Sequence, residues 1–277
     1  MIFCNRFTRP GLLAGVLLLG LAAPAGAGYT QFDFNTGDLS ATFGAGILSY
    51  FKNASAADVQ FGTASSFGIA ALPGGDAGVM RFPRFAPDKG LFLNTAAPPN
   101  GGGAYINQFT MVWDVLVPDV SANWLSFFNS NDANANDGDF FIRPHDGGIG
   151  ISDVYHGNVT SGQWHRIAAS FDLTGPTLSK YIDGILVGSQ TLSQGVDGRW
   201  SLYSANDPLR GVLILADNDG DINPGYLNSF LFVDRAMTLS EIAALGGPNA
   251  IGIIREPSSA LLLLASGAAW LLWRRRG

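Results

Sequence analysis

The sequence has almost no cysteine and very little glutamate. Its one cysteine, Cys4, lies within the first ten of 277 residues, so the rest of the chain can form no disulfide within itself. A disulfide-built fold is excluded, and the protein must be held by a buried core, helped at most by a metal. Among 22 acidic residues, only Glu241 and Glu256 are glutamates. Since aspartate favours turns and glutamate favours helices, the skew indicates a β-rich chain with many loops.

Positive charge is scarce in the long central part of the chain. Residues 28–254 hold ten Lys and Arg against 21 Asp and Glu, a formal charge near −11, whereas the whole chain carries −6. The other six arginines lie near the two ends. A nucleic-acid-binding surface needs an excess of positive charge to meet phosphates, so nucleic acid is excluded as a partner.

Motifs of the common enzyme classes are also absent. We find no G-x-S-x-G and no glycine-rich phosphate loop ahead of a helix. The three histidines, His145, His156 and His165, lack the spacing of a metal-binding motif. His165 follows Trp164 in a strand-like run, and we expect it to have a structural role.

The first 27 residues have the three parts of an export signal. Arg6 and Arg9 precede an apolar run of 13 residues at 11–23, and Ala25-Gly26-Ala27 forms an A-x-A cleavage site. The run is short for a permanent membrane anchor, which is the alternative. We therefore expect a signal peptide over 1–27, cleaved after Ala27, and an exported protein.

The central part of the chain is predicted to consist of short β-strands. Apolar or alternating runs are broken by Gly, Pro, Asn and Asp, the pattern of a β-sandwich or barrel. The runs lie at 31–34, 41–51, 59–62, 78–82, 90–94, 109–118, 124–130, 139–144, 148–152, 164–173, 178–190, 213–218 and 226–237. Asp183-Gly184 predicts a hairpin turn. One short helix is expected after Thr238 or Ser240 as N-cap, ended by Gly246-Gly247.

Three segments carry a family resemblance. Residues 162–172 (GQWHRIAASFD), 180–188 (KYIDGILVG) and 226–245 (YLNSFLFVDRAMTLSEIAAL) resemble, in order and spacing, the bacterial laminin-G-like domains of the concanavalin A-like lectin/glucanase fold. The resemblance implies an all-β, two-sheet antiparallel jelly-roll sandwich over 28–250. Trp113 and Trp164 would then be packed between the sheets rather than exposed for sugar stacking.

Two acidic clusters are candidate calcium sites. Asp217, Asp219 and Asp221 alternate around Gly220, and oxygen ligands in such a loop suit calcium, although the spacing is not that of an EF-hand. The weaker cluster consists of Asp132, Asn134, Asn136, Asp137 and Asp139. Laminin-G-like domains often carry calcium at a rim, so the resemblance favours these sites. Ordinary solvated turn aspartates are the alternative.

A hydrolase is disfavoured by the glutamate content. A retaining glycosidase of this fold needs two carboxylates about 5 Å apart, usually from E-x-D-x-E on one strand, and that motif is absent. We expect a non-catalytic domain that binds carbohydrate or another extracellular matrix polymer, with or without calcium. A structural matrix or adhesion protein without a small ligand is the alternative, followed by a polysaccharide hydrolase with an Asp-based site.

The last 23 residues form a second targeting segment. Ala260–Trp273 is 14 uncharged residues, which as a helix would span about 21 Å against a hydrocarbon core of about 30 Å. Arg274, Arg275 and Arg276 follow and would remain cytoplasmic. Together with Glu256-Pro257, the segment 255–277 resembles the PEP-CTERM sorting signal, with Arg255 where that motif has its first proline. The resemblance implies a Gram-negative bacterium, a short transmembrane helix held transiently in the inner membrane, processing by an exosortase, and delivery to the cell surface or matrix.

Overall fold

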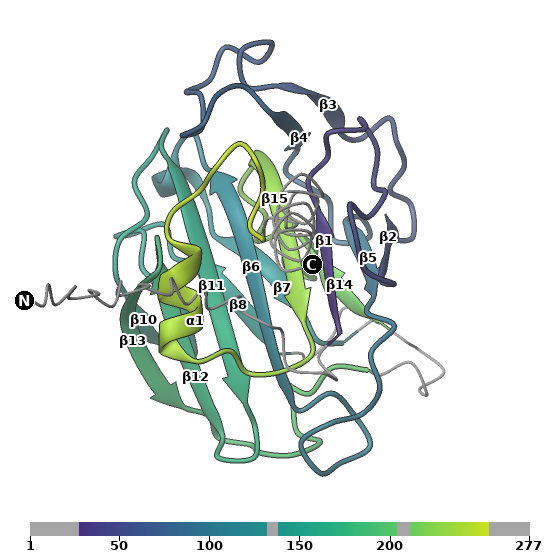
Figure 1. Cartoon of the computed structure of the whole chain (residues 1–277), viewed down its shortest axis with the longest axis vertical. Helices are drawn as coiled ribbons and strands as arrows, with labels where there is room; N and C mark the ends of the chain where they lie inside the picture. Colours follow the sequence, from purple (N-terminus) through teal and green to yellow (C-terminus); the bar gives the residue numbers. More distant parts are fainter. Residues whose placement is uncertain (1–27, 132–137, 204–210, 255–277) are drawn as a thin grey trace, which may run out of the picture.

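Two antiparallel β-sheets pack face to face (Figure 1). The structure is a computed structural model, and it describes residues 28–131, 138–203 and 211–254. The expected signal peptide and C-terminal helix lie outside these residues. Among the residues described, no helix is long and apolar enough to cross a membrane.

Sheet A has the strand order β13-β12-β11-β6-β15-β4-β3, with β1 also paired to β15. Its strands are β1 (Tyr29–Phe32), β3 (Gln60–Thr63), β4 (Gly78–Phe82), β6 (Gln108–Leu116), β11 (Trp164–Asp172), β12 (Thr177–Ile182), β13 (Ile185–Thr191) and β15 (Gly225–Val233). Sheet B has the order β10-β9-β8-β7-β14-β5-β2. Its strands are β2 (Ile47–Tyr50), β5 (Leu91–Asn94), β7 (Leu125–Asn129), β8 (Asp139–Ile142), β9 (Ile149–Ile151), β10 (Val154–His156) and β14 (Val212–Ile214). The all-β, two-sheet antiparallel sandwich expected from the sequence is confirmed.

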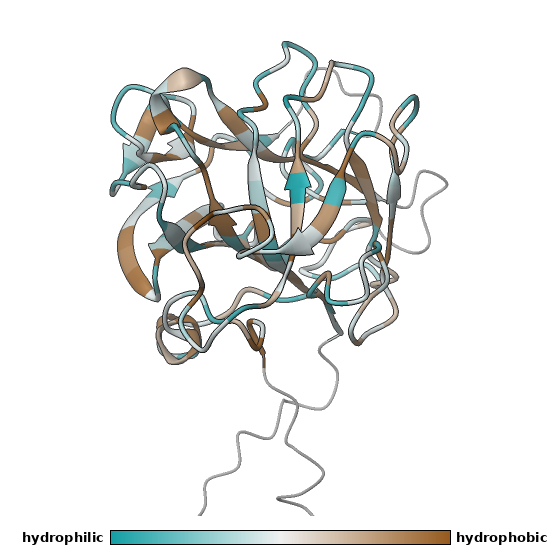
Figure 2. Ribbon diagram, turned by 90° about the horizontal axis from the view of Figure 1, so that it is seen from above, coloured by the Kyte–Doolittle hydropathy of each residue, from teal (hydrophilic) through white to brown (hydrophobic). Residues whose placement is uncertain are grey.

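The core lies between the sheets because alternate residues of each strand are apolar. In β6, Phe109, Met111 and Trp113 point into this core, and Trp113 lies over Phe127 of sheet B at 4.7 Å between ring centroids. Figure 2 shows the apolar sequence concentrated along the strands, with much of the polar sequence in the connecting loops. The prediction that Trp113 packs between the sheets is confirmed by these contacts.

The prediction that Trp164 packs between the sheets is wrong. Trp164 is 8% exposed and buried, but it packs with Leu72, Leu116 and Tyr226 on the outer face of sheet A. Its Nε1–H donates to the carbonyl oxygen of Ala70 at 2.6 Å. Strand parity explains the difference, since Ile167 of the same strand points inward and a residue three positions away must point outward.

Local turn and cap chemistry follows the sequence closely. The Asp183-Gly184 turn joins β12 and β13 with φ values of 54° and 79°, as a type I′ hairpin requires. Helix α1 (Leu239–Leu245) begins at Thr238, whose side chain and that of Glu241 form a reciprocal capping box, and Gly246 ends it at φ 62°. Helix α1 lies on the outer face of sheet A (Figure 1), where Ile242 is buried. A single 3₁₀ turn, η1 (Val120–Ala122), precedes β7.

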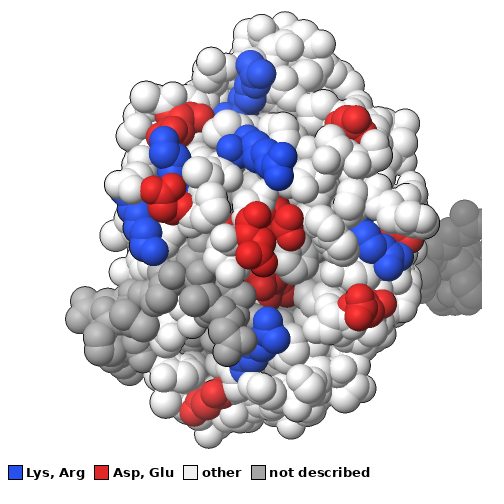
Figure 3. Space-filling model, turned by 180° about the vertical axis from the view of Figure 1, so that it is seen from behind, with Lys and Arg blue, Asp and Glu red and all other residues white. Residues whose placement is uncertain are grey.

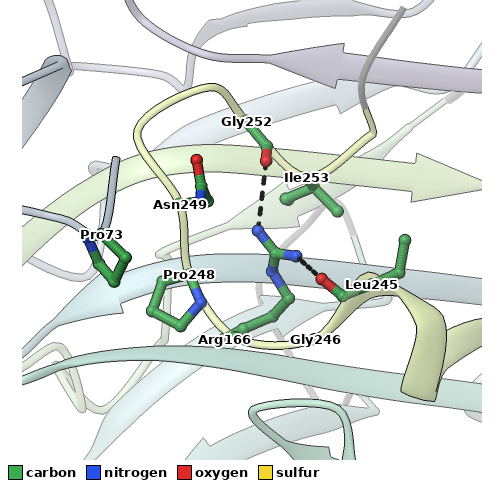
Figure 4. A pocket seen from close by; sticks show the side chains of 9 residues that line it. Pro73, Arg166, Leu245, Gly246, Pro248, Asn249, Gly252 and Ile253 are labelled. Atoms are coloured by element: carbon green, nitrogen blue, oxygen red, sulfur yellow. Dashed lines mark hydrogen bonds between the residues drawn. The ribbon is translucent and has the colours of Figure 1, made fainter. Parts of the chain in front are cut away.

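A buried ion pair fixes the segment that follows α1. Arg166 of β11 is 2% exposed and donates from Nε and Nη2 to the carboxylate of Asp114, which is fully buried, at 2.7 Å each. Its Nη1 and Nη2 also donate to the carbonyl oxygens of Leu245 and Gly252 (Figure 4). These groups line a cavity of about 380 Å³. Because the guanidinium is committed to Asp114 and to two carbonyl groups, we assign this cavity a structural role.

Candidate functional site

Sheet B turns one face away from the core, and aromatic side chains gather there. In β8, Phe140 and Ile142 are buried between the sheets, so Asp139 and Phe141 point to the opposite face by alternation. The strand register places Phe141 opposite Gly150 of β9, and Gly150 opposite Tyr155 of β10. Since Gly150 has no side chain, nothing from β9 separates the two rings.

Trp124, just before β7, joins these rings into a cluster. Its ring centroid lies 5.7 Å from that of Phe141 and 5.5 Å from that of Tyr155. All three side chains are half-buried, so each is held by packing and still reaches solvent. We define the aromatic face as these three rings together with Arg143, Asp139 and Asp221.

Arg143 places a positive charge on this face. Its guanidinium lies 4.6 Å from the centroid of the Tyr155 ring, a cation–π contact, and bonds to both carboxylate oxygens of Asp146. The hydrogen bonds from Arg143 and from the N–H of Gly148 hold the pKa of Asp146 below its usual value. The guanidinium is therefore fixed in place beside the ring of Tyr155.

The charges of carboxylates near in sequence and distant from it act on Tyr155. Burial raises the pKa of Tyr155 to about 12, the negative charges of Asp153, Asp139 and Asp221 act in the same direction, and Arg143 opposes them. The phenol therefore remains protonated at physiological pH and can both donate and accept hydrogen bonds. Figure 3 views the molecule from the side of sheet B and shows acidic side chains gathered near the middle of that face, with basic side chains above and below.

Asp221 reaches this face because its loop is joined to β7. The N–H of Ser126 donates to the carbonyl oxygen of Asp221 at 2.8 Å, and the N–H of Asn223 donates to that of Trp124 at 2.8 Å. Burial raises the pKa of Asp221, the carboxylates of Asp217 and Asp219 raise it further, and Arg84 opposes this shift. The same loop therefore positions Asp221 and orders the backbone of Trp124.

Asp217 organises the loop from within. It is 4% exposed, and its Oδ1 accepts the backbone N–H groups of Asp219 and Asp221 at 2.8 and 3.1 Å. Gly220, with φ 78°, completes the turn. The carboxylate of Asp217 therefore stabilises the loop.

Calcium at the two acidic clusters stays a prediction. Across 28–131, 138–203 and 211–254, no three Asp, Glu, His or Cys side chains are arranged to hold a metal ion. The grouping of Asp217, Asp219 and Asp221 therefore gives calcium no geometric support. In the second cluster, Asp132, Asn134, Asn136 and Asp137 lie outside the described residues, and Asp139 lies on the aromatic face.

Other candidates from the sequence serve the scaffold. His165 Nε2 accepts the N–H of Thr160 at 3.1 Å, so its proton is on Nδ1 and points to Asp183 at 2.9 Å. Its expected structural role is thus supported by two satisfied ring nitrogens. Glu241 binds Arg235 and the cap of α1, and hydrogen bonds from Arg235 are the main reason that its pKa falls to about 2. It lies on the outer side of sheet A, away from the aromatic face.

Sequence reasoning missed the aromatic face itself. Trp124, Phe141, Arg143 and Tyr155 were not singled out as site residues, because short runs do not reveal which ring points outward. The run DFFIR at 139–143 did contain a signal, since a charge at each end and an aromatic residue between them share one parity. The partner strand β10, which carries Tyr155, is only three residues long and gave no recognisable pattern.

Comparison with known proteins agrees with this architecture. Residues 104–243 match the family model described as the concanavalin A-like lectin/glucanases superfamily. A search of curated proteins finds no relative of this sequence.

Several solved structures share the fold at low identity. Domain 4 of AbnA, a GH43 extracellular arabinanase from Geobacillus stearothermophilus solved in complex with arabinotriose, is 19% identical, with 79% of this chain and 98% of that chain covered and a TM-score of 0.49. The binding domain of botulinum neurotoxin DC, solved in complex with SialylT, is 10% identical, with coverages of 78% and 49% and a TM-score of 0.50. The receptor-binding domain of botulinum neurotoxin type G is 11% identical, with coverages of 78% and 49% and a TM-score of 0.47. The chain thus spans about half the length of the neurotoxin domains, and these likenesses concern the fold alone. The family model matches half of the sequence, and the chain belongs to the concanavalin A-like lectin/glucanases superfamily.

Proposed function

We propose that this protein is an exported, non-catalytic domain that binds carbohydrate through the aromatic face of sheet B. The observation that carries the proposal is the contact of three half-buried rings, Trp124, Phe141 and Tyr155, within reach of Arg143 and of carboxylates. The C–H side of a sugar ring packs on aromatic surface, while its hydroxyl groups bond to carboxylates and to a guanidinium. The combination of apolar surface with a few placed polar groups is typical of ligand sites.

The family membership supports a carbohydrate ligand, because the superfamily is named for lectins as well as for glucanases. The non-catalytic part of the proposal is supported by the position of Glu241, the only glutamate of residues 28–254, which is engaged with Arg235 on the opposite side of the sandwich. A general acid in a glycosidase must instead flank the scissile bond together with a second carboxylate.

Export is a further part of the proposal. Residues 1–27 would direct the chain through the inner membrane and be removed after Ala27. Residues 255–277 would hold it transiently at that membrane until an exosortase-type enzyme processes the tail near Glu256-Pro257. The extracellular polysaccharide or another matrix polymer would then be the partner of the aromatic face. Mass spectrometry of both ends of the purified protein tests these two cleavages.

A glycan array with the purified protein tests the binding. We expect Trp124→Ala to lower the affinity for a bound glycan at least about tenfold, which corresponds to about 1.4 kcal/mol. Phe67→Ala is the matched control, because Phe67 is also half-buried and in tilted ring contact with a tyrosine, Tyr226, but lies on the outer face of sheet A. The control should bind like the unmodified protein.

The same array separates the alternatives. No glycan signal with or without a calcium chelator would overturn carbohydrate binding and favour the structural matrix or adhesion role. A signal lost only with chelator would support calcium. Turnover of a polysaccharide, abolished by Asp139→Asn or Asp221→Asn, would replace the non-catalytic proposal with the hydrolase.

A further inference from the structure

The start of the described chain lies against an aspartate at the end of β15. Strands β1 and β15 pair antiparallel with Tyr29 opposite Val233. The ladder extends one residue further, since the N–H of Asp234 donates to the carbonyl oxygen of Gly28 at 3.0 Å. Gly28 and Asp234 are therefore neighbours across two strands, at a fixed register.

Within the described part of the chain, no Lys or Arg forms a salt bridge with the carboxylate of Asp234, and its buried Oδ1 has no hydrogen-bond partner. Burial raises the pKa of Asp234, and backbone hydrogen bonds from Gly28 and from Asp234 itself, together with the charge of Arg235, counteract part of that shift. The adjacent cation, Arg235, uses Nη1 and Nη2 for the two carboxylate oxygens of Glu241. Oδ1 of this half-buried carboxylate thus remains without a hydrogen-bond donor.

Gly28 allows this carboxylate to approach the backbone closely. A Cβ atom at position 28 would lie 2.9 Å from Oδ2 of Asp234, which is too close for an undisturbed contact. Gly28 and Asp234 also line a cavity of about 190 Å³, together with Thr30, Ala45 and residues 95–98.

We propose that removal of the leader after Ala27 creates an ion pair between the new α-ammonium group of Gly28 and the carboxylate of Asp234. The proposal rests on the cleavage included in the proposed function. Hydrolysis breaks the bond between the carbonyl carbon of Ala27 and the nitrogen of Gly28. The hydroxyl of water goes to Ala27, which leaves as a carboxylate, and the nitrogen of Gly28 is protonated to an ammonium group. The enzyme class required is a signal peptidase, with water as the only co-reactant.

The cleavage changes the nitrogen of Gly28 in two ways. A neutral amide with one N–H becomes a cation with three donors, and a charge-assisted hydrogen bond is stronger than a neutral one. Asp234 therefore acts as a positioning residue for the processed N-terminus and stabilises β1 on β15. The folded domain becomes more stable after export than before it.

The experiment uses the full chain, exported and purified from a Gram-negative host, with its N-terminus identified by mass spectrometry. The melting temperature is measured before and after acetylation of the α-amine, for the unmodified protein, for Asp234→Asn and for Asp38→Asn. Asp38 is the control because its carboxylate is exposed and bonds only within its own turn. Lysines are acetylated equally in all three proteins, so their contribution cancels.

We expect acetylation to lower the melting temperature of the unmodified protein and of Asp38→Asn. This decrease should exceed the decrease in Asp234→Asn by about 2–4 °C. A mature chain that starts at another residue would overturn the cleavage and the ion pair together. A chain that starts at Gly28 but shows no acetylation effect, or the same effect in Asp234→Asn, would overturn the ion pair and leave the cleavage intact.

A second measurement does not depend on the folding of a variant. At neutral pH a free α-amine is acetylated before lysine side chains, because it loses its proton more readily. An α-ammonium group held by Asp234 should react more slowly, relative to the exposed Lys52, in the folded protein than in the same protein unfolded in urea. If the ratio of the two rates is the same in both states, the ion pair is absent.

Discussion

One buried lysine, Lys180, fixes the aromatic face from the core side of sheet B. Lys180 of β12 is fully buried, and its Nζ donates to the carbonyl oxygen of Val154 at 2.6 Å and to Gln190 Oε1 at 2.8 Å. Val154 directly precedes Tyr155, so a lysine of sheet A fixes the strand of sheet B that presents this ring. Burial lowers the pKa of Lys180 to about 8.

Lys180 should leave a signature in the pH dependence of stability. In the unfolded chain its pKa is close to 10.5, so between about pH 8 and about pH 10.5 the unfolded state holds a proton that the folded state has released. The free energy of unfolding must then rise with pH across this window. Urea denaturation across the window should show less of this rise in Lys180→Met than in the unmodified protein. Equal slopes in the two proteins would contradict the assignment.

Asp217 should matter more for stability than its exposed neighbour. Asp217→Ala removes the acceptor of two backbone N–H groups in a buried turn, and we expect a loss of about 1–3 kcal/mol. Asp219→Ala, at an exposed position of the same loop, should change the free energy of unfolding by no more than about 0.5 kcal/mol. Denaturant titration of both variants checks this, and equal losses would show that Asp217 does not organise the loop.

The hairpins of sheet A are the elements in which sequence determines geometry most directly. At the β12–β13 turn, Gly184 has φ 79°, and a Cβ there would lie 3.1 Å from Cα of Gly246 after α1. Gly184→Ala should therefore destabilise the protein by about 1–2 kcal/mol. In the preceding β11–β12 turn, a Cβ on Gly175 would meet nothing within 4 Å, so Gly175→Ala is the matched control and should be nearly neutral. Thermal melts that do not separate the two variants would refute this assignment.

The strand pattern, the Asp183-Gly184 turn and the capping box at Thr238 could be predicted from sequence, since each depends on neighbours within a few residues. The face on which a side chain lies was harder to predict. Trp164 was assigned to the wrong side of sheet A because the register of its strand is set by long-range pairing with β6. The aromatic face is harder still, because Trp124 and Tyr155 meet only when β7, β8, β9 and β10 are placed in order.

At the scale of the whole molecule, the negative net charge should favour binding of uncharged polysaccharides over anionic ones. Residues 28–254 carry close to −11 in formal charge, so an anionic polysaccharide is repelled while an uncharged one is not. We expect binding of an uncharged glucan to be nearly independent of salt. Binding of a uronate polymer should strengthen as ionic strength rises from about 0.01 M to about 0.15 M, because salt screens the repulsion. Isothermal titration at both salt concentrations checks this, and weaker uronate binding at the higher salt would imply attraction instead.

The two boundaries of the folded body lie side by side. Gln31 of β1 bonds to both the N–H and the carbonyl oxygen of Ile254, and residues 253 and 254 pack on the outer face of sheet A. A tether attached at either boundary would therefore join the molecule on the side of sheet A. If that tether ends in a membrane, the outer face of sheet A faces the membrane and the outer face of sheet B faces away from it. Retention at a surface and capture of a polymer then use opposite sides of one small domain, and neither obstructs the other.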